Sequence, residues 1–110
     1  MVEIKNYEIF LEAQNANAIL LASFSTKGCS VCHAIGPRVK ELADELEIPL
    51  IKVDIEDAPM ISGQFNVFTV PTVLLFFRGR EYHRQSRFID LYEIRRRGLE
   101  LIKGMEPSTK

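Results

Sequence analysis

The sequence has little cysteine and no long apolar run. Among 110 residues there are only two cysteines, too few to hold a chain of this size together as a disulfide scaffold. Crossing a bilayer takes about 20 consecutive apolar residues, whereas Ala18 to Ala22, a run as long as any here, has five residues. The first residues also lack the basic start and apolar middle of a signal peptide. We therefore expect a cytoplasmic protein that does not contact membranes.

The overall composition is that of a globular protein. Apolar residues make up 46% and charged residues 26%, which argues against disorder and against a collagen-like chain. Glycine and proline occur singly, and no repeat or linker interrupts the patterned segments. At this length about two thirds of the unfolded surface can be buried. We expect one domain over residues 1–110.

Charge is divided unevenly along the chain. Residues 1–70 hold 5 basic and 10 acidic side chains, whereas residues 71–110 hold 9 basic and 5 acidic ones. The basic end includes Arg78, Arg80, Arg84, Arg87 and the run Arg95-Arg96-Arg97. Such a cluster is one way to bind nucleic acid. Because the runs are short and mixed with acidic residues, we interpret them as solvated faces and expect no nucleic-acid partner.

Buried apolar runs alternate with helical periodicity along most of the chain. The pattern predicts strands at 2–4, 18–24, 49–54, 72–77 and 81–88, with helices between and after them. Alternation of this kind predicts parallel strands with crossover helices, and the last two strands form an antiparallel hairpin. The polar strand 81–88 is expected at the edge of the sheet. The predicted fold class is α/β, with a mixed central sheet and helices on both faces.

Helix starts and inward faces follow from the same pattern. Asn6, Asp57 and Asp90 are the expected N-caps of three helices. In the long helix at 31–47 the expected inward residues are Val31, Ile35, Val39, Leu42 and Leu46, and Gly36-Pro37 should kink it. In the last helix the expected inward residues are Leu91, Ile94, Leu99 and Ile102.

The two cysteines form a Cys29-Ser30-Val31-Cys32 motif between a buried strand and the long helix. Only a thiolate attacks disulfides, and a free cysteine, with a pKa of about 8.5, is mostly protonated at pH 7. The unpaired N–H groups of a helix N-terminus favour an anion. We therefore predict that Cys29 is the attacking thiol and that the more covered Cys32 resolves the mixed disulfide. Ser30 and Val31 would tune the stability of the thiolate.

Other interpretations use the same residues. The pair could be an incidental, buried one. Cys29-Ser30-Val31-Cys32-His33 also matches the attachment pattern for c-type haem, but no export signal is present. Zinc would need His33 and a fourth ligand such as His83, yet His33 follows Cys32 directly on a helix and converges poorly with it. We expect neither a metal nor a bound cofactor.

Taken together, these motifs resemble the thioredoxin family. The resemblance rests on the cysteine pair, Pro37, Lys52, Val70-Pro71-Thr72 and Gly79. It implies a thioredoxin-like fold with Lys52 beneath the active site. It also implies a cis bond before Pro71, facing Cys29, with the main chain of Val70 pairing with substrate. Gly28, Ser30 and Val31 are further expected substrate contacts, and His33, if protonated, would add positive charge beside the pair.

Three residues depart from the family pattern. Gly28 stands where these proteins usually carry Trp, which removes an aromatic lid beside the attacking sulfur. Ser23 stands where they usually bury an Asp, so a carboxylate that can relay a proton is missing. Arg87 falls where they often have Gly at the border of the substrate groove.

The resemblance implies a thiol–disulfide oxidoreductase that reduces disulfide-containing proteins or low-molecular-weight mixed disulfides. Electrons would come from a flavin-dependent reductase or from a low-molecular-weight thiol. The alternative is a thioredoxin-like binding module that presents the Val70-Pro71 groove or the Arg-rich end to a partner. The missing Asp and Trp favour the module, whereas the intact cysteine pair and proline loop favour the enzyme.

Overall fold

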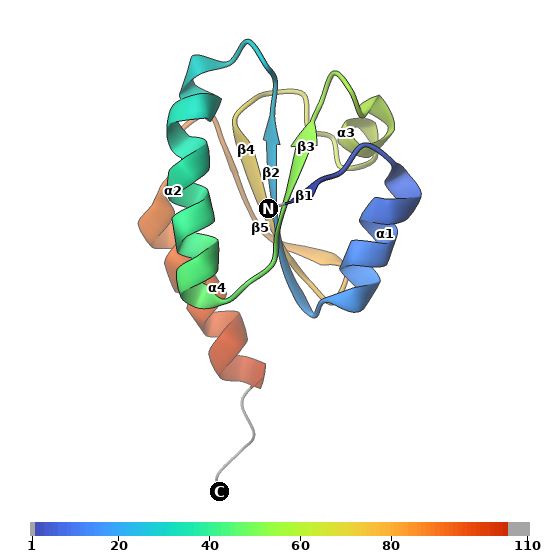
Figure 1. Cartoon of the computed structure of the whole chain (residues 1–110). Coiled ribbons are helices and arrows are strands. Elements are labelled where there is room, and N and C mark those ends of the chain that lie inside the picture. Colours follow the sequence, from blue (N-terminus) through green and yellow to red (C-terminus); the bar gives the residue numbers. More distant parts are fainter. Residues whose placement is uncertain (1, 106–110) are drawn as a thin grey trace, which may run out of the picture.

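A computed structural model describes residues 2–105 of the chain (Figure 1). Residues 1 and 106–110 of the expected domain lie outside this described part. The elements, in chain order, are β1 (Val2–Glu3), α1 (Tyr7–Ala16), β2 (Ile19–Ser25), α2 (Ser30–Leu46), β3 (Leu50–Asp54), α3 (Pro59–Gln64), β4 (Thr72–Phe77), β5 (Arg80–Ser86) and α4 (Leu91–Met105). Over residues 2–105, no helix combines the length and apolar character that a bilayer crossing requires.

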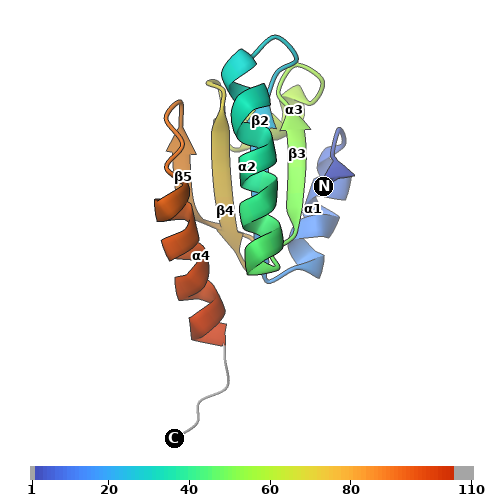
Figure 2. The ribbon, with the colours of Figure 1, turned by 60° about the vertical axis from the view of Figure 1, so that its left-hand side comes forward.

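A five-stranded sheet in the order β1-β3-β2-β4-β5 forms the centre of the molecule. The β1–β3 and β2–β3 pairs are parallel, and the β2–β4 and β4–β5 pairs are antiparallel. Helices α2 and α4 cover one face, and α1 and α3 cover the other (Figures 1 and 2). The expected α/β class, mixed sheet and edge position of β5 are confirmed.

Strand β2 contributes to the cores on both faces of the sheet. Its side chains alternate, so Leu20, Ala22 and Phe24 pack toward α1 and α3, whereas Leu21 packs toward α2 and α4. On the first face the rings of Phe10, Phe65 and Phe76 lie 5.0–5.8 Å apart, centroid to centroid. Burial on both faces explains why β2 is almost continuously apolar.

The direction of β4 differs from what alternation predicts. Although α3 separates β3 from β4, β4 runs antiparallel to β2, with Thr72 opposite Phe24. The connecting residues 55–71 therefore stay at the edge of the sheet where β2 and β3 end. A six-residue helix is only about 9 Å long, too short to carry the chain back along the sheet. As a result, Pro71 and Cys29 lie at the same edge.

Three local expectations were wrong. Asp57 does not cap α3, whose N-cap is Ala58; the backbone N–H groups of the preceding turn are instead bound by the Asp54 carboxylate. Val31 is 55% exposed, because the first turn of α2 extends past the end of β2 (Figure 2). Leu99 is 47% exposed, because α4 turns Ile94, Gly98 and Leu101 inward.

Gly98 sets how closely α4 approaches α2. A Cβ atom at this position would lie 2.9 Å from Leu46 Cδ1 and 3.3 Å from Ile48 Cδ1. We expect Gly98→Leu to lower the free energy of unfolding by about 1–3 kcal/mol through overpacking. Urea denaturation measures this, with Gly104→Leu as the matched control, because a Cβ on Gly104 meets nothing within 4 Å. Equal effects of the two substitutions would contradict the assigned contact.

His83 should make the stability of the folded protein depend on pH. Burial lowers the pKa of His83 from its ordinary value of 6.5, and the positive charge of Arg97 lowers it further. The unfolded chain therefore binds a proton that the folded chain resists, so stability should fall as the pH drops below about 6.5. His83→Gln should flatten this dependence in thermal unfolding between pH 5 and pH 7. An unchanged dependence in His83→Gln would contradict the assignment.

Candidate active site

Cys29 occupies the N-cap position of α2. Its Sγ atom accepts a hydrogen bond from the backbone N–H of Cys32 at 3.2 Å, and its carbonyl accepts one from the N–H of His33 at 3.2 Å. The sulfur thus satisfies one of the free N–H groups that begin the helix, as an N-cap oxygen does elsewhere. A negative charge on this sulfur would be stabilised by the same N–H group and by the helix dipole.

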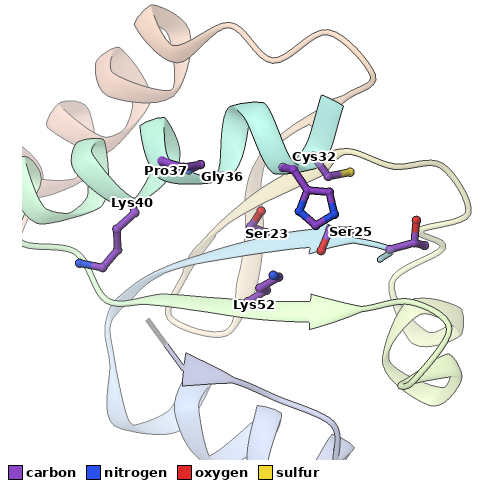
Figure 3. Close-up of a pocket in the computed structure, with 9 residues that line it drawn as sticks. Ser23, Ser25, Cys32, Gly36, Pro37, Lys40 and Lys52 are labelled. Atoms are coloured by element: carbon purple, nitrogen blue, oxygen red, sulfur yellow. The ribbon is translucent and has the colours of Figure 1, made fainter. Parts of the chain in front are cut away.

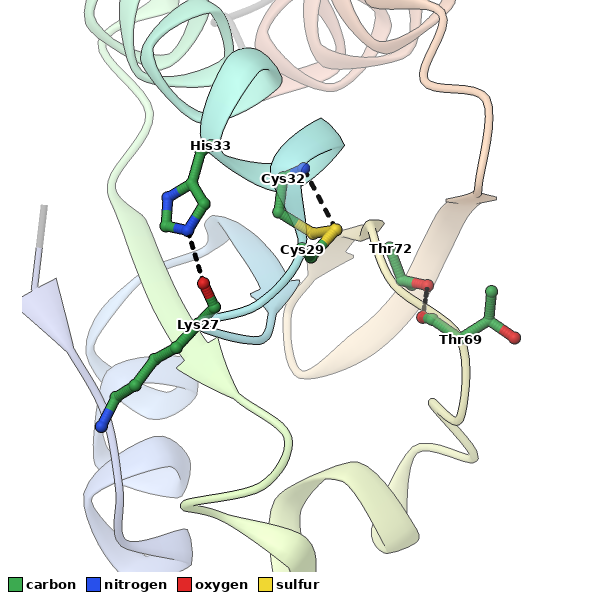
Figure 4. Close-up of a disulfide and its surroundings, with 6 residues drawn as sticks. All are labelled: Lys27, Cys29, Cys32, His33, Thr69 and Thr72. Atoms are coloured by element: carbon green, nitrogen blue, oxygen red, sulfur yellow. Dashed lines mark hydrogen bonds between the residues drawn. A yellow bond between two sulfur atoms is a disulfide. The ribbon is translucent and has the colours of Figure 1, made fainter.

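The second cysteine is bonded to the first and is more covered. Cys29 and Cys32 form a disulfide with Cα atoms 5.2 Å apart (Figure 4). Cys32 is only 7% exposed, whereas Cys29 is half-buried. The neighbouring Gly28, Ser30 and Val31 are all exposed, and a Cβ at Gly28 would meet nothing within 4 Å. Approach to the pair is therefore open on the Cys29 side.

The proline loop lies against the same end of the sheet. The Val70–Pro71 peptide bond is cis, the geometry that the resemblance implies. Thr69 and Thr72, which flank this bond, lie on one side of the disulfide in Figure 4, where the Thr72 hydroxyl donates to the Thr69 carbonyl at 2.6 Å. The backbone N–H of Arg87 donates to the Pro71 carbonyl at 2.8 Å. Pro71 is buried and Val70 is half-buried.

Two exposed aromatic residues in these loops were missed by the sequence analysis. Phe68 is 73% exposed and lies two positions before Val70, and Phe88 is 90% exposed and follows Arg87. Arg87 has a positive φ of 70°, which suits the glycine common in the family better than an arginine. For Phe68 the usable signal was a large aromatic residue in a predicted loop, where burial is not expected. Phe88 was assigned to the strand predicted at 81–88, but β5 ends at Ser86.

A cavity of about 310 Å³ lies beneath the first half of α2 (Figure 3). Ser23, Ser25 and Lys52 line it from the sheet, and Cys32 lines it from the helix. Ser23 is 9% exposed and lies opposite Lys52 in the β2–β3 register. The structure thus brings Lys52 beneath the cysteine pair, beside the serine that replaces the family's carboxylate.

His33 is tied to the loop that precedes the motif. Its Nε2 atom lies 2.7 Å from the carbonyl oxygen of Lys27 (Figure 4). Because a carbonyl oxygen can only accept, this ring nitrogen carries a proton in either charge state of the imidazole. The contact joins the first turn of α2 to the segment before Cys29, so His33 supports the shape of the motif.

The arginines of α4 pair with carboxylates on the protein's own surface. Arg96 and Arg97 both contact Glu93 and Glu100, and Arg95 pairs with Glu45 of α2. This helix face therefore carries mixed rather than positive charge. Among the residues that the structure describes, no three His, Cys, Asp or Glu side chains are grouped to hold a metal ion.

Comparison with known proteins agrees with this geometry. The family model described as Thioredoxin matches residues 1–96. The chain belongs to the thioredoxin family. A mutant thioredoxin from Halobacterium salinarum has the same fold, with a TM-score of 0.83 at 20% identity over 97% of this chain and 92% of that one.

Curated thioredoxin relatives match over most of the chain. The thioredoxin-like protein YdfQ of Bacillus subtilis is 38% identical over 71 residues, which are 64% of this chain and 63% of that protein. The thioredoxin of Chlamydia trachomatis is 33% identical over 85 residues, covering 76% of this chain and 82% of that protein. The match thus spans less than two thirds of the Bacillus relative's length.

The two thiols of this thioredoxin-family site should react at different rates once reduced. We expect iodoacetamide at pH 7 to modify Cys29 at least ten times faster than Cys32, because Cys29 Sγ is accessible and bound by a helix N–H, whereas Cys32 is buried. Mass spectrometry of peptides after brief labelling measures the ratio. Equal rates, or faster labelling of Cys32, would contradict the assignment of Cys29 as the attacking thiol.

Proposed function

We propose that this chain is a thiol–disulfide oxidoreductase that works through Cys29 and Cys32. The observation that carries the proposal is the position of Cys29 Sγ at the N-cap of α2, where it accepts the N–H of Cys32. This contact stabilises the thiolate that disulfide exchange requires. Family membership supports the same activity.

The reaction proceeds through two exchanges. The Cys29 thiolate attacks one sulfur of a substrate disulfide, forms a mixed disulfide and releases the other substrate sulfur as a thiolate, which takes up a proton. Cys32 then loses its proton and attacks Cys29 Sγ, which releases the second substrate thiol. The pair is oxidised by two electrons and the substrate disulfide is reduced by two. The close approach of the cysteines, with Cα atoms 5.2 Å apart, suits this second step.

Substrates would bind along the proline loop as extended segments. The main chain of Val70 would pair with the substrate backbone, and Gly28, Ser30 and Val31 would contact the segment around its disulfide. The exposed rings of Phe68 and Phe88 add apolar area beside this loop. Backbone pairing and apolar contacts depend little on the side chains of the substrate. This low sequence specificity supports a range of disulfide-containing proteins as substrates.

Each cycle leaves the pair oxidised, so a two-electron donor must reduce it. A flavin-dependent reductase or a low-molecular-weight thiol can supply both electrons without a cofactor bound to this chain. We place the activity in the cytoplasm, where a reducing thiol pool keeps such a pair reduced. The open surface at Gly28 leaves room for a small thiol to reach the Cys29 sulfur.

A trapping experiment tests the proposal. Reduced Cys32→Ser protein should accumulate a mixed disulfide through Cys29 with an oxidised protein substrate, because the resolving thiol is absent. Cys29→Ser should trap nothing and should lower disulfide reduction at least a hundredfold, with dithiothreitol as electron donor. Non-reducing electrophoresis and mass spectrometry identify the linked cysteine. Partners that bind both variants equally without covalent linkage would instead establish the binding module.

A further inference from the structure

The cavity beneath α2 exists because small residues surround it. Ser23 and Ser25 point from β2 toward the helix, and Gly36 of α2 has no side chain (Figure 3). A Cβ at Gly36 would meet no atom within 4 Å, so the space beside it is open. A volume of about 310 Å³ falls at the lower end of the range of small-ligand sites.

The polar side chains that line this cavity are hydroxyls, two lysines and the imidazole of His33. Ser23, Ser25, Thr26, Lys40 and Lys52 are among the lining residues, and none of the described lining residues is acidic. Hydroxyls and ammonium groups are the donors that bind oxyanions. A partly enclosed cavity whose charged side chains are positive also raises the local concentration of anions.

Lys52 is the cation available to a ligand. It is half-buried in the middle of β3, and within residues 2–105 it forms no ion pair with a carboxylate. Glu3 lies opposite Lys52 in the β1–β3 register but pairs with Lys5. Lys40 extends away from Lys52 (Figure 3) and pairs with Asp44 at 2.5 Å.

We propose that this cavity binds a small basic oxyanion, a carboxylate or hydrogen phosphate, which accepts the proton of the Cys32 thiol during resolution. Lys52 and the serine hydroxyls bind its oxygens. Cys32 lines the same cavity, and none of the other described lining residues is a carboxylate that could accept its proton. The imidazole of His33, which also lines the cavity, is held on the Lys27 carbonyl through its Nε2 atom. The inference rests on the proposed redox function of the pair.

The step balances as a proton transfer coupled to disulfide exchange. The oxyanion takes the proton from Cys32 Sγ, and the resulting thiolate attacks Cys29 Sγ of the mixed disulfide. The Cys29–Cys32 bond forms as the bond to the substrate sulfur breaks. The substrate leaves as a thiolate, and the protonated oxyanion returns a proton to it directly or through water. The oxyanion is regenerated and no external oxidant or reductant takes part.

Binding is tested on the oxidised protein, without turnover. Acetate, phosphate and sulfate are titrated separately at constant ionic strength while backbone amide NMR shifts are recorded. All three should shift the amides of Ser23, Ser25 and Lys52 in a saturable manner. Lys52→Met should weaken this binding about tenfold or more, whereas Lys103→Met, on the exposed end of α4, should leave it unchanged. Absence of saturable shifts, or equal binding by Lys52→Met, would overturn the proposal.

The proton-transfer role is tested by the rate at which a preformed Cys29 mixed disulfide with a small thiol is resolved. At pH 7, acetate and phosphate should each accelerate resolution several-fold, and sulfate, a much weaker base, should not. Ser23→Asp places a carboxylate beside Lys52 and should make resolution fast and independent of added anion. Acceleration by sulfate, or continued acceleration in Ser23→Asp, would overturn the proposal. The rate of resolution measured without any added anion tests the redox function of the cysteine pair separately from anion binding.

Discussion

The antiparallel pairing of β4 with β2 is the constraint on which the site depends. It places Thr72, at the start of β4, opposite Phe24, near the end of β2. The chain leaves β2 toward Cys29 and enters β4 from Pro71, so both loops emerge at one edge of the sheet. Ladder hydrogen bonds in the buried centre of the sheet set this register, and a slip of one residue would turn every side chain of β4 to the wrong face.

Helix α2 has two parts with different surroundings. Its second half packs on apolar residues of the sheet and of α4, because Val39, Leu42 and Ala43 are buried there. Its first half covers the polar cavity lined by Ser23, Ser25 and Lys52. Packing of the second half holds the helix in place, so the N-terminal turn can carry Cys29 without much apolar contact of its own.

Strong apolar patterns made most of the fold predictable. The buried strands and the α2 start at the cysteine motif follow from residues adjacent in sequence, and the Asn6 and Asp90 side chains bind N–H groups of the helices they precede. Features that depend on residues far apart in sequence were not predictable. Leu99 faces outward because Gly98 packs against Leu46 and Ile48, and a glycine adds nothing to apolar periodicity.

In the candidate site, as in the fold, the parts that belong to local sequence patterns were predictable and the rest were not. The motif and the resemblance identified Cys29, Cys32 and Pro71, because each belongs to a short local pattern. The cavity was not foreseen, because it arises where β2, β3 and α2 each contribute small or polar residues. Phe68 and Phe88 were missed because apolar periodicity identifies buried residues, whereas these two rings are exposed in loops.

The proline loop is secured by contacts that do not involve sulfur. Thr72 contacts both the Thr69 carbonyl and the Ser86 hydroxyl, and Arg87 donates its N–H to the Pro71 carbonyl. Breaking the disulfide therefore removes none of the contacts that hold the surface proposed to bind substrate. The change of redox state is confined to two side chains at the start of α2. A rigid loop beside the cysteine pair holds the substrate disulfide at a fixed position relative to the attacking sulfur. Less conformational entropy of the protein is then lost when the first exchange begins.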